Sequence, residues 1–263
     1  MKSPYDPQTL FLTHYHVVLK LAAQFIPQIT FYPEEKILDV GCRNGKITGL
    51  LAHLNPDSTI SALTTSNIFL NAIKQDPTLQ TLSKVHFEQA DVTEFNYKEK
   101  YDKVVSFSCL TWYENKEKIV SNIYQSLKPG AKAYLQFFVD HGQDWFDACI
   151  FAIAAKPEWK SYFQQFKKKV DHIKPGAFLS QAEKIGFVIQ QSNLPKRQVL
   201  LPNEQYFKHW LITWSSHFSY LPPEKVDAFF DEVVEYYIYQ HPKDNLGRIT
   251  YEDYFFEVVL LKP

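Results

Sequence analysis

The stretch that decides the fold is Lys36–Thr48, which reads KILDVGCRNGKIT. An apolar run ends in Asp39, a turn containing Gly41 and Gly45 follows, and an amphipathic helix then begins. Glycine lets the backbone approach a ligand without a Cβ in the way, and the first N–H groups of a helix offer donors to that ligand. This order of strand, tight turn and helix start predicts a nucleotide-like ligand over the end of the first strand of an α/β sheet.

The chain after this stretch alternates between strand-like and helix-like patterns. Apolar and β-branched runs predict strands at 36–40, 59–64, 85–90, 101–108 and 131–138. Apolar residues at helical spacing, together with capping residues, predict helices at 9–29, 45–54, 66–75 and 114–127. Strands that alternate with helices in this way predict a doubly wound, mainly parallel sheet.

The pattern changes after Phe138. Two aromatic, helical regions follow at 144–169 and 203–240, with a further helix at 175–184 and strands at 187–192 and 251–261. A strand, a long helical insertion and a final strand predict an antiparallel pair at the sheet edge. We therefore expect one domain over residues 1–263, with helical lid elements at about 143–170 and 203–241 before the last strand.

Composition limits the partners and the compartment. The formal net charge is −1, and only Arg43, Arg197 and Arg248 are arginines, so nucleic acid is not an expected partner. The three cysteines are scattered, which favours reduced thiols and a cytoplasmic location, although export through a non-standard signal stays open. The N-terminus lacks the apolar core of a signal peptide, and no apolar run is long enough to span a membrane. The oligomeric state does not follow from the sequence.

Ligands of open α/β sheets bind at the carboxyl ends of the strands, near the point where the strand order reverses. This rule selects the residues that follow the first four strands. They are Asp39, Gly41, Arg43, Gly45, Thr64, Thr65, Asp91 and the segment Ser108–Tyr113.

These motifs resemble those of the class I S-adenosylmethionine-dependent methyltransferases, in the same order and spacing, from the first strand to the fifth. The segments that carry the resemblance are Leu38–Cys42, Ala90–Val92, Tyr101–Asp102 and Leu127–Gly130. It implies a seven-stranded, Rossmann-like methyltransferase fold, an enzyme, and S-adenosylmethionine as the cofactor.

The resemblance also implies roles for single residues. Gly41 and Gly45 would lie under the amino-acid end of the cofactor, and Asp39 would orient the loop, partly through the ammonium group. Asp91 would accept a hydrogen bond from the adenine amino group, and Val92 would supply a backbone N–H. The other cofactor-binding candidates are Arg43, Thr64 and Ser108, with Leu63 and Phe69 as further residues on the adenine side.

Two positions depart from the family pattern. Arg43 stands where the family has the middle glycine of its turn, and its side chain would reach the cofactor carboxylate or obstruct the pocket. Thr64 stands where an acidic residue clasps the ribose hydroxyls; the loss of such a charged hydrogen bond costs about 1.5–3 kcal/mol. These departures support an alternative function: a degenerate methyltransferase-fold protein that acts as a binding or interaction module without catalysis.

A narrower resemblance concerns the substrate. Thr111-Trp112, the segment Tyr206–Leu211 and the opening Tyr5–Pro7 are similar to those of the trans-aconitate and juvenile hormone acid methyltransferases. It implies O-methylation of a small-molecule carboxylate, although Thr111 stands where these enzymes have histidine. A carboxylate is already ionised at pH 7 and needs no general base. The candidates for the substrate pocket are Tyr15, Trp112, Tyr113, Trp145 and Trp210.

Other interpretations stay open at this point. A phenol or amine substrate would need a base, which His14, His16, His141, His209 or His217 could supply. The turn after the first strand also occurs in dinucleotide enzymes, Asp91 could cap a turn, and tryptophans are more often core than pocket. Methylation of a protein or an RNA is a third function. The histidines lack the spacing of metal ligands, so no metal site is expected.

Overall fold

The computed structural model describes residues 5–140, 145–167 and 172–263. Contacts divide the chain into two compact units, which we describe separately. The sheet unit comprises the described residues within 18–140, 172–195 and 254–263, and the helical unit those within 5–17, 145–167 and 196–253. The described parts of both predicted lid elements fall in the helical unit, whereas the existence of a single domain with a lid stays a prediction.

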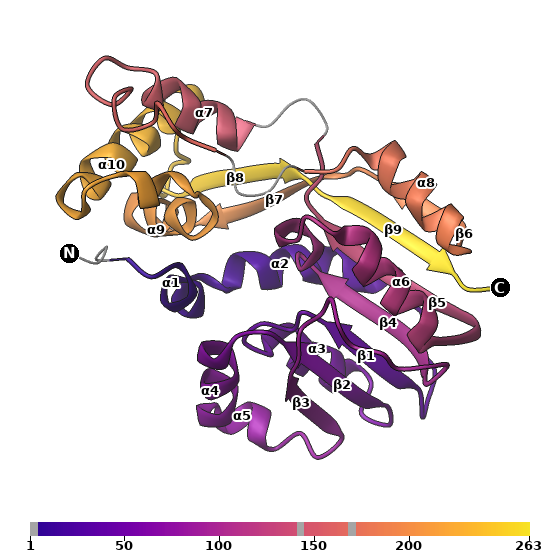
Figure 1. Cartoon of the computed structure of the whole chain (residues 1–263). Coiled ribbons are helices and arrows are strands. Elements are labelled where there is room, and N and C mark those ends of the chain that lie inside the picture. The colour runs from indigo at the N-terminus through magenta and orange to yellow at the C-terminus, as the bar shows by residue number, and fades with distance from the viewer. Residues whose placement is uncertain (1–4, 141–144, 168–171) are drawn as a thin grey trace. The chain divides into compact units, whose positions relative to one another are not determined.

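The sheet unit is built on a seven-stranded sheet with the order β3-β2-β1-β4-β5-β9-β6 (Figure 1). Strands β1 to β5 pair in parallel, and β9 runs antiparallel to both β5 and β6. This arrangement confirms the predicted doubly wound, mainly parallel sheet and the antiparallel pair at its edge. The strands are β1 Lys36–Val40, β2 Thr59–Thr64, β3 Val85–Gln89, β4 Tyr101–Phe107, β5 Leu127–Phe137, β6 Val188–Asn193 and β9 Phe256–Leu261.

Helices cover both faces of this sheet (Figure 1). Ile37 on β1 belongs to the core cluster that includes residues of α2 and α3, and its neighbour Leu38 belongs to the cluster of α6 and α8. Successive side chains of a strand point to opposite faces, so both faces of the central strands are buried. The helices of this unit are α2 His16–Phe25, η1 Ile26–Gln28, α3 Lys46–Leu54, α4 Asn67–Gln75, α5 Pro77–Gln80, η2 Leu110–Trp112, α6 Lys116–Ser126 and α8 Pro175–Ile185.

Local signals account for several of these boundaries. The Ser66 hydroxyl accepts a hydrogen bond from Phe69 N at 3.4 Å, so Ser66 caps the start of α4, as the sequence predicted. Helix α8 ends at Ile185 and is followed by Gly186, which has a left-handed φ of 118°. Strand β5 begins four residues earlier than the predicted start at Ala131, because Leu127 already pairs with Tyr101 before a shift in register.

The helical unit contains α1 Pro7–His14, α7 Trp145–Ala154, α9 Glu204–Trp214, η3 His217–Tyr220 and α10 Pro223–Gln240. It also contains a two-stranded sheet of β7 Lys196–Leu201 and β8 Ile249–Tyr254. Three predictions were wrong here. The region predicted as helical at 144–169 is helix only over Trp145–Ala154, and turns follow it in the described residues. The helix predicted at 9–29 is divided between α1, α2 and η1, and the strand predicted at 251–261 is two strands, because Phe255 leaves the ladder and its N–H donates to Pro195 O at 3.1 Å.

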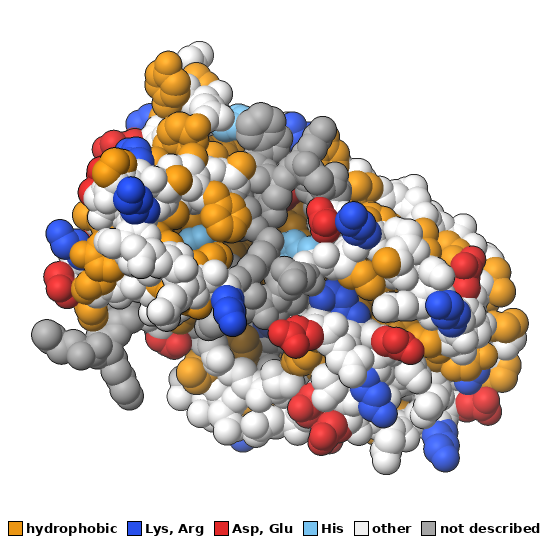
Figure 2. Space-filling view, turned by 45° about the horizontal axis from the view of Figure 1, so that its top comes forward, with side chains coloured by type: hydrophobic (Ala, Val, Ile, Leu, Met, Phe, Trp, Pro, Cys, Tyr) orange, Lys and Arg blue, Asp and Glu red, His pale blue; other side chains and the backbone are white. Residues whose placement is uncertain are grey.

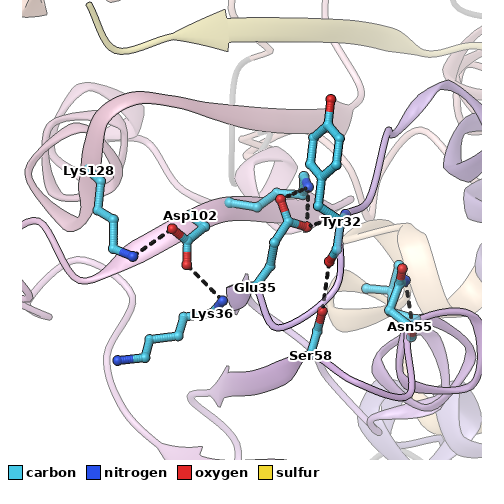
Figure 3. Close-up of polar contacts among 9 residues, drawn as sticks. Tyr32, Glu35, Lys36, Asn55, Ser58, Asp102 and Lys128 are labelled. Carbon is cyan, nitrogen blue, oxygen red and sulfur yellow. Dashed lines mark hydrogen bonds and ion pairs between the residues drawn. The ribbon is translucent and has the colours of Figure 1, made fainter.

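An ionic cluster lies at the amino ends of the central strands (Figure 3). Lys103 Nζ contacts both carboxylate oxygens of Glu35, at 2.7 and 2.5 Å, and the Lys103 side chain is only 3% exposed. Asp102 accepts hydrogen bonds from Lys36 N at 2.9 Å and from Lys128 Nζ at 2.6 Å. The cluster ties β1, β4 and β5 together at the edge opposite their carboxyl ends.

Candidate functional site

Asp39 is buried in β1 and faces helix α3. Its Oδ2 accepts a hydrogen bond from the Thr48 hydroxyl at 2.7 Å, and its residue is 1% exposed. Burial raises the pKa of Asp39 to about 7, and the bond from Thr48 opposes that rise. Asp39 thus fixes the start of α3 relative to β1, as expected for the residue that orients the turn.

Two glycines give the turn after β1 its shape. Gly41 and Gly45 have φ values of +82° and +74°, a region that side-chain-bearing residues rarely adopt. A Cβ on Gly41 would lie 2.2 Å from Cys109 Sγ, so only glycine fits against the loop after β4. The N–H groups of Gly41 and Cys42 donate to Leu63 O at 3.0 and 2.8 Å, which fastens the turn to β2.

Arg43 continues this turn and reaches toward the loop after β4. Its φ is +50°, and its Nη2 donates to Ser108 O at 3.2 Å. Its Cζ lies 5.7 Å from the centroid of the Trp112 ring, within the range of a cation–π contact. Burial lowers the pKa of Arg43 to about 10, so the guanidinium is cationic at neutral pH. The structure thus brings together Arg43 and Ser108, two of the residues that the sequence selected.

Thr64 is the last residue of β2, and Asp91 follows the end of the neighbouring strand β3. Thr64 is buried at the end of β2, and the Val92 side chain is buried in the core cluster of α6 and α8. Asp91 is exposed, and its Oδ1 accepts hydrogen bonds from Thr93 N and the Thr93 hydroxyl, both at 2.8 Å. Asp91 therefore caps a turn, while its Oδ2 accepts no hydrogen bond from the described residues.

The two adenine-side candidates differ in exposure. Leu63 is fully buried in the core cluster of α6 and α8, where its carbonyl receives the two N–H groups of the turn. Phe69 is half-buried on the first turn of α4. Phe69 is thus the one of the two whose side chain is partly accessible.

The pocket candidates are distributed over both units. In the sheet unit, Trp112 is 39% exposed and Tyr113 is half-buried, and burial raises the pKa of Tyr113 to about 12. Thr111, which replaces the family histidine, accepts a hydrogen bond from Phe138 N at 3.1 Å and so holds the end of β5. The Thr111 hydroxyl therefore stabilises the position of the chain at the end of β5.

In the helical unit, Trp210 is fully buried, and its ring contacts those of Trp214 and Tyr251. Tyr15 is half-buried after α1. The side chain of Trp145 lies outside what the structure describes, as does His141. That these residues line a substrate pocket stays a prediction.

Among the histidines proposed as bases, His14 and His217 are buried and His209 is half-buried. The rings of His14 and His209 lie 5.2 Å apart, and burial lowers the pKa of both. His16 is exposed. Within the described ranges, no group of three or more histidine, cysteine or acidic residues could hold a metal ion.

The surface carries charges of both signs. On the side shown in Figure 2, lysine and arginine side chains alternate with aspartate and glutamate, and hydrophobic side chains lie among them. No helix in the part of the chain that the structure describes has the length and apolarity needed to cross a membrane.

Sequence reasoning missed two contacts that support the site. Thr48 was not recognised as the partner of Asp39, although a threonine on the inner face of an amphipathic helix was a usable signal. Cys109 lies in the selected segment Ser108–Tyr113, but the contact of its Sγ with the space beside Gly41 was not foreseen, because that contact depends on how β1 and β4 pair.

Comparison with known proteins agrees with the fold and the position of the turn. The model of a methyltransferase-domain family matches residues 32–184. Protein 235L of Invertebrate iridescent virus 6, named as a methyltransferase, is 28% identical over 149 residues, which is 57% of this chain and 54% of the viral protein. The chain thus spans about half of that relative's length.

Two bacterial relatives carry substrate names. A malonyl-[acyl-carrier protein] O-methyltransferase of Priestia megaterium is 22% identical over 260 residues, covering 90% of this chain and 88% of that protein. A trans-aconitate 2-methyltransferase of Deinococcus radiodurans is 27% identical over 109 residues, covering 41% and 40%.

Among solved structures, the YcgJ protein of Bacillus subtilis has a TM-score of 0.62 at 12% identity and covers 94% of this chain and 98% of that chain, a similarity that shows the fold alone. The family model covers more than half of the sequence, including β1, its turn and the strand ends described above. The chain therefore belongs to the methyltransferase-domain family.

Proposed function

We propose that this protein transfers the methyl group of S-adenosylmethionine to a carboxylate oxygen of a small-molecule acid. The observation that carries the proposal is the turn after β1, where Gly41 is packed against Cys109 and Asp39 is fixed to Thr48. The turn lies at the carboxyl end of β1, beside β4, where the strand order reverses.

The residues of the sheet unit fit the proposed cofactor. Gly41 and Gly45 keep side chains away from the turn, and the Asp39 carboxylate would act on the cofactor ammonium through the loop that it orients. The accessible Oδ2 of Asp91 would accept from the adenine amino group, while Oδ1 keeps the turn capped. Thr64 would offer one hydroxyl to the ribose, and Val92 a backbone N–H.

The cofactor supplies an electrophilic methyl group on a sulfonium when it is bound. A carboxylate nucleophile is ionised at neutral pH, so the chain's own residues need only align it and exclude water. Trp112 and Tyr113, which follow β4, are proposed for that task because they are large and partly accessible. A phenol is neutral at physiological pH, and burial raises the pKa of Tyr113 further, to about 12, so its hydroxyl can donate a hydrogen bond.

The substrate class rests on the relatives. One is named as an O-methyltransferase of malonyl-[acyl-carrier protein] and another as a trans-aconitate 2-methyltransferase, and each is similar to this chain at low identity. Both named substrates carry carboxylates, which favours an acid over a phenol or an amine. The Thr111 hydroxyl is engaged with the backbone at the end of β5, at the position where the trans-aconitate enzymes have histidine, so the identity of the acid does not carry over.

The test is a methyl-transfer assay with labelled S-adenosylmethionine against trans-aconitate, malonyl-CoA, medium-chain fatty acids, phenols and amines. We expect a base-labile methyl ester on at least one acid, with a rate that varies less than about threefold between pH 6 and 9. Transfer to phenols or amines alone, with a rate that rises with pH, would refute the carboxylate assignment. Cofactor binding without transfer to any compound would support the degenerate alternative, which Thr64 and Arg43 favour.

A further inference from the structure

A pocket outside the candidate site lies among α4, α5 and β3, the edge strand of the sheet (Figure 1). Its volume is about 320 Å³, at the lower end of the range of about 300–1,000 Å³ that small-molecule sites occupy. The part of β3 that lines it is Val85–Phe87, the first three residues of the strand. The pocket is therefore separate from the residues that follow the carboxyl ends of β1 to β4.

The inner wall of the pocket is apolar and is held in place by the core. Ile73 is 1% exposed and Leu79 is 4% exposed, and they belong to one core cluster with Cys42, against which Phe87 packs. The Phe87 ring and the Leu79 side chain lie 2.8 and 3.1 Å from the position of a Cβ on Gly45. The wall is thus packed against the turn after β1, and an apolar ligand group would find a preformed surface there.

The polar side chains that line the pocket are Lys74, Gln80 and His86, and none of the lining residues is acidic. The Gln80 amide is engaged, because its Nε2 donates to Ile73 O at 3.1 Å. Lys74 is exposed on α4, and no ion pair or hydrogen bond among the described residues involves its ammonium group. An ammonium group has three donors. The charge that the pocket offers to a ligand is therefore positive.

The neighbouring carboxylates do not neutralise this charge, because other groups bind them. Asp76 contacts Lys46 Nζ through Oδ2, and its Oδ1 caps α5 by accepting from Leu79 N at 3.2 Å. Glu88 on β3 accepts a hydrogen bond from the Tyr97 hydroxyl at 3.0 Å. An apolar wall beside an uncompensated cation is complementary to a ligand with a hydrocarbon part and an anionic end.

We propose that this pocket is a second binding site, which takes a small amphipathic carboxylic acid. The hydrocarbon part lies against Ile73, Leu79 and Phe87, and the carboxylate pairs with Lys74. Octanoate has a suitable size, because about ten non-hydrogen atoms at about 30 Å³ each would fill the volume. The site does not take part in the proposed methyl transfer, so the inference does not rest on the proposed function.

The test is a titration of the full chain, followed by the amide signals in heteronuclear NMR. The ligands are octanoate, octan-1-ol and octylammonium, which share a hydrocarbon chain and differ in the charge of the end group. The amides of Leu79, His86 and Phe87 report on the pocket, and those of Gly41 and Ser108 report on the candidate cofactor site.

Three variants accompany the titrations. Lys74→Met removes the cation, and Leu70→Trp enlarges a half-buried lining residue of α4 so that it fills the pocket. The control is Lys118→Met, which changes an exposed lysine of α6. Helices α4 and α6 lie on opposite faces of the sheet, because their core clusters contain successive residues of β2. Circular dichroism verifies that each variant is folded.

We expect octanoate to shift the three pocket amides with a Kd on the order of 1 mM. Octan-1-ol should bind at least about threefold more weakly, and octylammonium more weakly still. Lys74→Met should weaken octanoate binding about threefold to tenfold and leave octan-1-ol within about twofold. Leu70→Trp should abolish the pocket shifts with both ligands, and Lys118→Met should leave them unchanged.

Four results would overturn the inference. The absence of pocket shifts at saturating octanoate would show that no acid binds there, and equal affinities for octanoate and octan-1-ol would show that the carboxylate is not recognised. Equal losses on Lys74→Met and Lys118→Met would indicate non-specific attraction to surface charge. Shifts confined to Gly41 and Ser108 would place the acid at the candidate cofactor site, which would refute the second site and leave the proposed function intact.

Discussion

At the scale of single residues, Gly41 controls the geometry of the turn after β1. Alanine there would need a left-handed backbone and would place its Cβ 2.2 Å from Cys109 Sγ. Gly130 is a matched control, because its φ is +78° and no atom lies within 4 Å of its Cβ position. Gly130→Ala should cost about 1–2 kcal/mol for the backbone alone, and Gly41→Ala about 1–3 kcal/mol more for the clash. Urea unfolding measures both; equal losses would contradict the close packing of Cys109.

The burial of Asp39 leads us to expect that the stability of the protein depends on pH. The folded-state pKa of Asp39, about 7, lies above the ordinary aspartate value of 3.8, so the folded state holds the proton more tightly than the unfolded chain. The stability that the protonated Asp39 carboxyl contributes to the fold is fully present below about pH 4, and it is lost as the pH rises through about 7. Asp39→Asn removes this dependence, so wild type should lose up to about 4 kcal/mol relative to the variant between pH 4 and 8.

The measurement is the free energy of unfolding of both proteins at pH 4, 5, 6, 7 and 8. Because the asparagine carbonyl can still accept from Thr48, the hydrogen bond itself is kept in the comparison. Parallel curves for the two proteins would show that Asp39 has an ordinary pKa and is not desolvated.

The local geometry of the turn and its caps could be predicted at this scale, for a physical reason, whereas the roles of these residues toward a ligand stay predictions. Asp39, Gly41, Gly45 and Asp91 belong to short local patterns of strand, turn and cap, which the sequence displays directly. The bond from Arg43 to Ser108 could not be predicted, since it joins residues 65 apart in sequence and depends on the register of β1 against β4. The burial of the Ser108 hydroxyl is likewise a property of packing.

At the scale of elements, the two ends of the central strands differ in the residues that they carry. The carboxyl ends carry the turn and its residues of left-handed φ, and the amino ends carry the ionic cluster of Glu35, Lys103 and Asp102 (Figure 3). This separation lets the strands be anchored without constraining the loops of the site. The ionic cluster can therefore be tested by its effect on stability alone.

Glu35→Gln should destabilise the fold by about 3–5 kcal/mol, because it leaves the buried Lys103 ammonium without its carboxylate. The double variant Glu35→Gln with Lys103→Met should recover a large part of that loss. Lys84→Met is the control, since its pair with Asp57 spans 3.9 Å and is largely exposed, and should cost less than about 1 kcal/mol. Thermal unfolding measures all three. A double variant as unstable as Glu35→Gln would contradict this explanation.

Strand and helix boundaries were predictable where one residue type decides them. Strand β2 and helix α4 lie where their β-branched run and their Ser66 cap placed them. Strand β7 was missed, and 251–261 was taken as one strand, because the division at Phe255 is made by a bond to Pro195 that no local pattern encodes. The alternating burial of β8 and the continuous burial of β9 show that the two strands belong to different surroundings.

At the scale of the whole molecule, the chain consists of two compact units. In the helical unit, Lys208 Nζ on α9 contacts Asp227 at 2.8 Å and Asp231 at 2.9 Å, both on α10. The Tyr5 hydroxyl donates to the same Asp227 oxygen at 2.6 Å. These bonds join the chain before α1 to two helices that are distant in sequence.

Lys208→Met should therefore loosen the helical unit while sparing the sheet. We expect amide hydrogen exchange to become at least tenfold faster in α1, α9 and α10, with β1, β4 and β5 unchanged. Lys243→Met, which removes an exposed pair with Glu204, is the control and should change little. Faster exchange throughout both units would show that they unfold as one cooperative body.

The central claim is that an adenosyl cofactor lies across the carboxyl ends of β1, β2 and β3. The most direct test is a crystal structure determined after crystals of the full chain are soaked with S-adenosylhomocysteine. We predict density for the amino-acid end over Gly41 and Gly45 and for the adenine beside Asp91 and Val92. A saturated crystal in which the Arg43 guanidinium fills that cleft, with no density for the nucleoside, would contradict the account.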